Sequence, residues 1–179
     1  MLCALAELVG SARPDVGVWA LAPRRSPLHH APGVTTLVSD QALMPAALAD
    51  IVAAPGPHLV LVDDADLLDD PTGSFAAFFA ARRPDVHLVA AARADTVRNA
   101  YGHWVAQVRR SRQGIVLRPH VDLDGDLWHV VLPRRGPERF DAGRGYLVCE
   151  GSIELVQTAL AGEPAGVLPA SHDPQGARP

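Results

Sequence analysis

A continuous aliphatic run that ends in two aspartates constrains the fold of this 179-residue chain most strongly. Residues 58–63 read His-Leu-Val-Leu-Val-Asp, and Asp64 follows directly. A short run of branched and aliphatic side chains is typical of a strand buried on both faces of a parallel sheet. The acidic pair then falls at the carboxyl end of the strand, where the ligands of open α/β sheets bind. The run therefore predicts an α/β fold with a candidate site at Asp63 and Asp64.

Helical stretches alternate with short β-rich runs along the rest of the chain. We expect helices over residues 2–11, 42–53, 74–83 and 95–110, strands over 16–21, 33–39, 58–63, 86–92 and 115–118, and further β structure over 127–132, 146–150 and 153–157. Gly10 is expected to end the first helix, Ser74 to cap the third, and Asp124-Gly125 to form a hairpin turn. This alternation predicts a three-layer α/β fold whose mainly parallel sheet is extended by antiparallel strands.

One domain over residues 1–160 and a disordered tail over 161–179 account for the length of the chain. The tail is predicted from its content of Pro, Gly, Ala and Ser. Hydrophobic residues make up 48% and charged residues 20% of the chain, a balance typical of globular proteins rather than disordered ones. No apolar run approaches the roughly 20 residues that a membrane helix needs.

The acidic pair has a specific chemical interpretation. An aspartate at the end of a buried strand, here Asp63, can hold Mg²⁺ while the metal bridges the phosphates of a nucleotide. The carboxylate of Asp64, the next residue, could orient an attacking water, although aspartate is one methylene shorter than glutamate. An acidic loop that is only solvated explains the spacing equally well, because the pattern is short.

Several further segments, in order, resemble the FtsK/SpoIIIE family of ATPases, and in particular the EccC-like ATPases of type VII secretion. The family's Walker B segment resembles Val62–Leu68, and its following strand, which ends in the sensor region, resembles Asp85–Arg93. Its next core strand resembles Gly114–Pro119. Its closing β segment resembles Gly143–Val148 and Ile153–Gln157. The resemblance extends over residues 1–160.

The resemblance implies a three-layer RecA-like P-loop NTPase fold and, in the complete domain, ATP and Mg²⁺ as cofactors. It implies Mg²⁺ binding through the nucleotide for Asp63, the water-orienting position for Asp64, and a sensor-region role for Arg93. An ion pair between Arg93 and the acidic loop Asp63–Asp70 is the favoured alternative for that arginine. The partners implied are other ATPase domains or subunits in a ring or tandem array, with DNA or a secreted protein as the translocated polymer.

The chain contains no lysine, because all 16 of its basic residues are arginine. The phosphate-binding pattern G-x-x-x-x-G-K-[ST] is therefore absent. The family's helix after that loop resembles Met1–Val9, so we expect a domain incomplete at the N-terminus, deficient in hydrolysis and with an exposed apolar edge. The alternative is a non-enzymatic α/β interaction module that docks to a secretion or translocation assembly.

Other features carry weaker expectations. Cys3 and Cys149 are too few for a disulfide framework and no basic N-terminal region marks a signal peptide, so we expect a cytoplasmic protein that reaches a membrane only through a partner. The net charge of −4 gives no reason to expect nucleic-acid binding. Arg109, Arg110 and Arg112 end a predicted helix and favour a solvated basic face over a DNA contact or a trans-acting arginine finger. Tyr101 and Trp104 fall on the same helix and are expected in the core.

Overall fold

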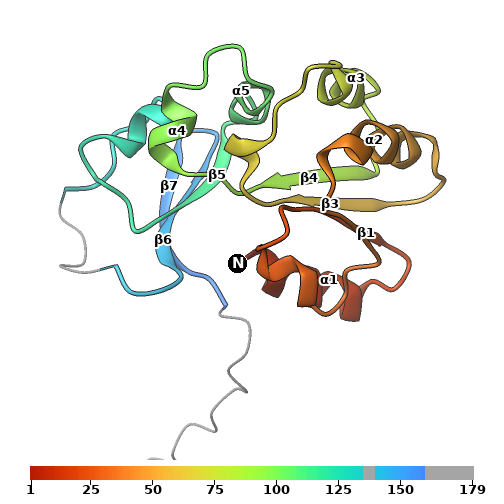
Figure 1. Cartoon of the computed structure of the whole chain (residues 1–179). Coiled ribbons are helices and arrows are strands. Elements are labelled where there is room, and N and C mark those ends of the chain that lie inside the picture. The colour runs from red at the N-terminus through yellow and green to blue at the C-terminus, as the bar shows by residue number, and fades with distance from the viewer. Residues whose placement is uncertain (135–139, 160–179) are drawn as a thin grey trace, which may run out of the picture.

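A four-stranded parallel sheet lies at the centre of the fold (Figure 1). The computed structural model describes residues 1–134 and 140–159. The sheet has the order β2-β1-β3-β4, formed by Thr36–Val38, Gly17–Leu21, His58–Val62 and Val86–Ala90. All three neighbouring pairs are parallel. β3 lies between β1 and β4, which confirms the buried parallel strand predicted from residues 58–63.

Helices cover both faces of this sheet, so the predicted three layers are present (Figure 1). The helix α1, Leu2–Ala12, lies on one face, while α2, Met44–Ala53, and α3, Ser74–Ala80, lie on the other. Short 3-10 turns at Pro27–His30, Gln41–Leu43 and Ala65–Leu67 connect these elements.

The side chains of β3 alternate between two cores. Val60 and Val62 pack with α2 and α3, whereas Leu59 and Leu61 pack with α1 on the opposite face. Val60, Leu61 and Val62 are fully buried. Successive side chains of a strand point to opposite faces, so an unbroken aliphatic run is what a sheet covered on both sides requires.

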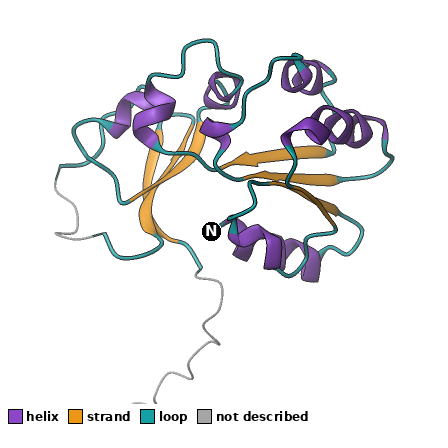
Figure 2. Cartoon of the chain, in the orientation of Figure 1, coloured by secondary structure: helices purple, strands orange, loops and turns teal. Residues whose placement is uncertain are grey.

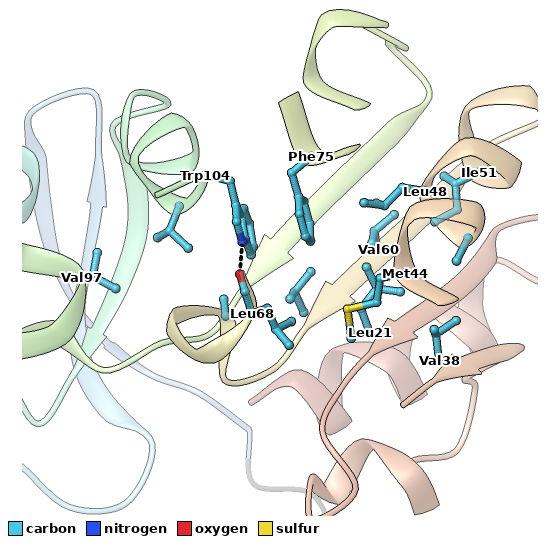
Figure 3. Packing of buried hydrophobic residues seen from close by; sticks show 14 of the residues in the cluster. Leu21, Val38, Met44, Leu48, Ile51, Val60, Leu68, Phe75, Val97 and Trp104 are labelled. Atoms are coloured by element: carbon cyan, nitrogen blue, oxygen red, sulfur yellow. Dashed lines mark hydrogen bonds between the residues drawn. The ribbon is translucent and has the colours of Figure 1, made fainter. Parts of the chain in front are cut away.

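An aromatic stack closes the larger core beside the carboxyl end of β3 (Figure 3). The rings of Phe75 and Trp104 are parallel with centroids 3.8 Å apart, and Trp104 Nε1 donates a hydrogen bond of 2.7 Å to the carbonyl of Leu68. Trp104 is buried as expected, but Tyr101 is 92% exposed, so its predicted place in the core is wrong.

The C-terminal strands form a second sheet rather than extending the first (Figure 2). β5, Gln113–Leu117, pairs with β6, Arg144–Cys149, and β6 pairs with β7, Ser152–Gln157, all antiparallel. The predicted strands are confirmed, but among the described residues none of them pairs with β4. β4 is therefore an edge of the parallel sheet.

The single helix predicted over residues 95–110 is two short helices. α4 spans Ala94–Arg98 and α5 spans Val105–Arg109. Between them Gly102 has a φ of 81°, a left-handed conformation that glycine adopts without steric cost and that a helix cannot contain. The amphipathic spacing continues across the break because both helices pack against the same core.

The β structure predicted over residues 127–132 is also wrong. Asp124–Trp128 forms a 3-10 helix, η4, in place of the predicted turn and strand. The buried carboxylate of Asp124 accepts hydrogen bonds of 2.7 Å from the His120 N–H and from Arg98 Nη2. These tertiary contacts hold the segment compact and oppose an extended backbone.

Two predictions about the ends of helices, at Gly10 and at Ser74, differ from the structure. α1 continues past Gly10 to Ala12, and Gly10 instead meets Gly33, where a Cβ on either residue would collide with the other segment. Gly73, not Ser74, occupies the cap position of α3. The carboxylate of Asp70 accepts from the N–H groups of Ser74 and Phe75, which is the capping contact expected of Ser74 itself.

No helix among the described residues is long and apolar enough to cross a membrane. The tail predicted over residues 161–179 lies outside the described residues.

Candidate functional site

Asp63 directly follows β3 and lies where the loop after β1 meets the sheet. Its N–H donates to the carbonyl of Leu21, the last residue of β1. The hydroxyl of Ser26 donates a hydrogen bond of 2.6 Å to Asp63 Oδ2. The Leu28 N–H in turn donates to Ser26 Oγ at 3.1 Å, which orients the hydroxyl. The carboxylate is therefore held by a buried serine, and among the described residues no hydrogen bond involves its Oδ1.

Asp64 has a left-handed backbone, with φ 48° and ψ 43°, and its side chain is exposed. Aspartate is one of the few residues that adopt this region at a modest cost. Partial burial raises the pKa of its carboxyl, and the charges of Asp63 and Asp66 add to that effect, while Arg93 opposes it. The pair thus repels itself, as two carboxylates do where no cation lies between them.

Arg93 follows β4 and lies against Asp66. Its backbone N–H and its Nε lie 3.4 Å from Asp66 Oδ1 and Oδ2. The Asp66 side chain is only 1% exposed, whereas that of Arg93 is 66% exposed. The interpretation that Arg93 pairs with the acidic loop agrees with this geometry, and its sensor-region role stays a prediction.

The carboxyl ends of β3 and β4 thus bring Asp63, Asp64, Asp66 and Arg93 to one edge of the sheet, as the sequence predicts. The sequence patterns do not predict Ser26, which lies in the loop between β1 and the 3-10 turn Pro27–His30. A signal existed: Ser26 precedes Pro27 in the segment that follows a buried strand, which is a favourable position for a capping hydroxyl.

The donor set at this edge suits a hard divalent cation. Carboxylate and hydroxyl oxygens are the ligands that Mg²⁺ prefers. Within residues 1–134 and 140–159, however, no group of three or more His, Cys, Asp or Glu side chains could hold a metal by itself. Mg²⁺ is usually bound through one or two carboxylates plus the phosphates of a substrate. Asp63 is therefore a candidate for one carboxylate ligand of this kind.

The fold and the position of this acidic edge define an α/β class of protein. Its parallel sheet is covered by helices on both faces, and the acidic pair lies at the carboxyl ends of the strands, where open sheets of this class bind their ligands. A small antiparallel sheet follows the parallel one along the chain.

Comparison with known proteins agrees at the level of the fold. The cytoplasmic domain of EssC superimposes with a TM-score of 0.60 and 15% identity, over 79% of this chain and 33% of that chain. EssC (ATPases 2 and 3) from Geobacillus thermodenitrificans superimposes with a TM-score of 0.57 and 16% identity, over 79% of this chain and 30% of that one. This chain thus spans about a third of the length of either structure.

Sequence comparisons add no family assignment. No model of a known protein family matches the chain, and no curated protein matches it. The structural neighbours share too few residues with this chain to transfer a site from one to the other, so their likeness concerns the fold.

Proposed function

We propose that this chain is the distal part of an ATP-binding motor domain of the FtsK/SpoIIIE type, similar to the EccC-like ATPases of type VII secretion, and deficient in hydrolysis by itself. The observation that carries the proposal is Asp63, which follows the central buried strand with its carboxylate anchored by Ser26. The likeness of the fold to EssC ATPase domains supports it.

In this proposal each residue at the acidic edge has a defined task. Asp63 is the Walker B aspartate and binds Mg²⁺ through its free oxygen, usually by way of water. Asp64 occupies the water-orienting position, and Arg93 the sensor region. When bound, Mg²⁺ would neutralise the charge of the nucleotide phosphates. The lysine that binds the phosphates in P-loop ATPases would have to come from outside these 179 residues, because the chain contains no lysine.

Weak hydrolysis follows from the geometry of the same residues. Asp64 is exposed on a left-handed turn and is one methylene shorter than a glutamate, so its carboxylate reaches less far toward an attacking water. Arg93 Nε contacts Asp66 at 3.4 Å, so only part of its guanidinium is available to a phosphate. Association with other ATPase domains, in a ring or tandem array, would supply the missing parts. DNA or a secreted protein would be the polymer moved, and the cytoplasm the place of action.

Calorimetric titration of the chain with ATP and Mg²⁺ tests the proposal. We expect binding in the micromolar range that requires Mg²⁺ and is lost in Asp63→Ala. Asp69→Ala removes an exposed carboxylate from the same loop and is the matched control, which should bind as the wild type does. Absence of heat at millimolar ATP with Mg²⁺, or equal binding by the two variants, contradicts a nucleotide site at Asp63.

The free edge of β4 favours a second candidate, an interaction module that docks to a secretion or translocation assembly. Backbone groups of Asp85 and Ala91 pair with β3 and the loop that follows it, so the alternate residues Leu88 and Ala90 direct their N–H and C=O groups to the open side. Among the described residues these groups have no backbone partner. An apolar edge without such partners is a template for an added strand.

Substitution at Ala90 tests this candidate. Ala90→Pro removes the outward N–H and is tolerated best at such an edge position, whereas Ala90→Val keeps the N–H. If docking uses the edge, co-expression with an adjoining ATPase domain should shift the elution volume of the valine variant but not of the proline variant. An equal shift in both variants contradicts docking at β4.

A further inference from the structure

A pocket of about 400 Å³ lies between the C-terminal end of α5 and η4, away from the acidic edge. Among the described residues its lining includes Arg109, Arg110, Arg112, Trp128 and His129, and no carboxylate. We call it the arginine pocket. In a chain with a net charge of −4, three arginines around one pocket concentrate positive charge.

Arg109 forms a fixed wall of the arginine pocket. Its Nε donates to the carbonyl of Leu127 at 3.3 Å and its Nη1 donates to the carbonyl of Val97 at 3.2 Å. These bonds tie α5 to η4 and to α4, and they leave the Nη2 donors of the planar guanidinium without a protein partner among the described residues. The expectation of a solvated arginine is therefore wrong for Arg109.

Arg110 and Arg112 complete the positive lining. Both are exposed, and within residues 1–134 and 140–159 neither forms an ion pair. Arg112 has a left-handed backbone with φ 53°, and its carbonyl accepts from the N–H of Glu150, which fixes the position of the chain. Their guanidinium groups have free donors of the geometry that binds phosphate in bidentate fashion.

Trp128 forms an aromatic wall of the arginine pocket. Its Nε1 is buried and has no hydrogen-bond acceptor among the described residues, so this N–H lies inside the fold and not on the pocket surface. The absence of a side chain at Gly114 makes room for the indole, since a Cβ there would collide with the ring. The indole is thus held in place beside the arginines.

We propose that the arginine pocket binds a compact oligophosphate, a chain of two or three linked phosphoryl groups, either free or as the phosphate tail of a nucleotide. The arginines bind the phosphoryl oxygens, and Trp128 lies beside them as an aromatic wall of the pocket. This site is separate from the acidic edge and needs no metal, because arginine provides the charge that Mg²⁺ provides elsewhere.

Titration with sodium tripolyphosphate in EDTA, followed by calorimetry and tryptophan fluorescence, tests the proposal. We expect saturable binding that Arg112→Gln weakens about tenfold, equivalent to about 1.4 kcal/mol. Arg82→Gln is the matched control, since Arg82 is also exposed with a left-handed backbone, and it should stay within about twofold of the wild type. Trp128→Phe should abolish the fluorescence change, because Trp128 lines the pocket.

Three results would overturn the proposal: no binding of tripolyphosphate, equal effects of Arg112→Gln and Arg82→Gln, or binding of ATP in EDTA without binding of tripolyphosphate, which would indicate recognition of the nucleoside. Asp63→Ala should leave tripolyphosphate binding in EDTA unchanged. The proposal of an arginine pocket can therefore be refuted independently of the proposed nucleotide site at Asp63, because binding at Asp63 depends on Mg²⁺.

Discussion

The hydroxyl of Ser26 lies 2.6 Å from Oδ2 of Asp63 and joins the loop after β1 to the end of β3. Ser26 is 6% exposed, so the hydrogen bond is largely shielded from water. A hydrogen bond to a charged acceptor is stronger than one between neutral groups. The contact therefore both orients the candidate metal ligand and anchors the loop that precedes η1.

Ser26→Ala should destabilise the chain by about 1.5–3 kcal/mol, because it removes a charged hydrogen bond and the capping acceptor of the Leu28 N–H. Urea unfolding measures the loss. Ser11→Ala is the matched control, since the Ser11 hydroxyl only bonds exposed carbonyls of its own helix and should change stability by less than about 0.5 kcal/mol. A loss in Ser26→Ala no larger than that of the control contradicts the anchoring role.

Replacing Trp104 separates stacking from hydrogen bonding. Trp104→Phe keeps a ring against Phe75 but leaves the carbonyl of Leu68 without its donor, so we expect a loss of about 1–3 kcal/mol. Trp104→Ala removes the whole ring and should cost about 3–5 kcal/mol. Denaturant unfolding checks both values. Tyr101→Ala should lie within about 0.5 kcal/mol of the wild type, because Tyr101 is almost fully exposed.

Asp64→Asn should stabilise the chain at neutral pH. Asparagine keeps the left-handed backbone and removes a charge that Asp63 and Asp66 oppose. Exposed charge interactions contribute about 0.2–1 kcal/mol. That range corresponds to a rise in Tm of about 0.4–4 °C.

The gain in Asp64→Asn should depend on pH. The pKa of the Asp64 carboxyl is raised in the folded state, so its destabilising charge is present only above that pKa and disappears as the pH falls below the ordinary range. Thermal melting at pH 7 and pH 3 measures the dependence. A gain that is equal at both values of pH would show that charge repulsion is not its cause.

The contribution of Asp85 to stability should depend on pH in the opposite sense to that of Asp64. Hydrogen bonds from Arg83 hold the pKa of the Asp85 carboxyl at about 2. The folded pKa is lower than the unfolded value of about 4, so the stabilisation is fully present above about pH 4 and is lost as the pH falls through 2. The difference in unfolding free energy between the wild type and Asp85→Asn should shrink over that window.

A second ion pair provides the control for Asp85. Arg13 and Asp15 form a similar pair at 2.8 Å, but that arginine donates to no other element. Arg83 also donates to the carbonyls of Val52 and Ala54 at the end of α2. Asp15→Asn should therefore change stability less than Asp85→Asn does, and an equal change would contradict a role for Asp85 in orienting Arg83 toward α2.

The sequence by itself determined the layered α/β fold, the central strand and the acidic pair that follows it. These features depend on local regularities: an aliphatic run needs a sheet covered on both faces, and the residues that follow parallel strands meet at one edge. Only the tertiary structure decided the break after α4, the 3-10 helix around Asp124 and the separation of the two sheets. Those features depend on contacts between distant residues, such as Arg98 with Asp124, which outweigh local propensity. For the same reason the hydrogen bond between Ser26 and Asp63 and the arginine pocket form only once the chain is folded.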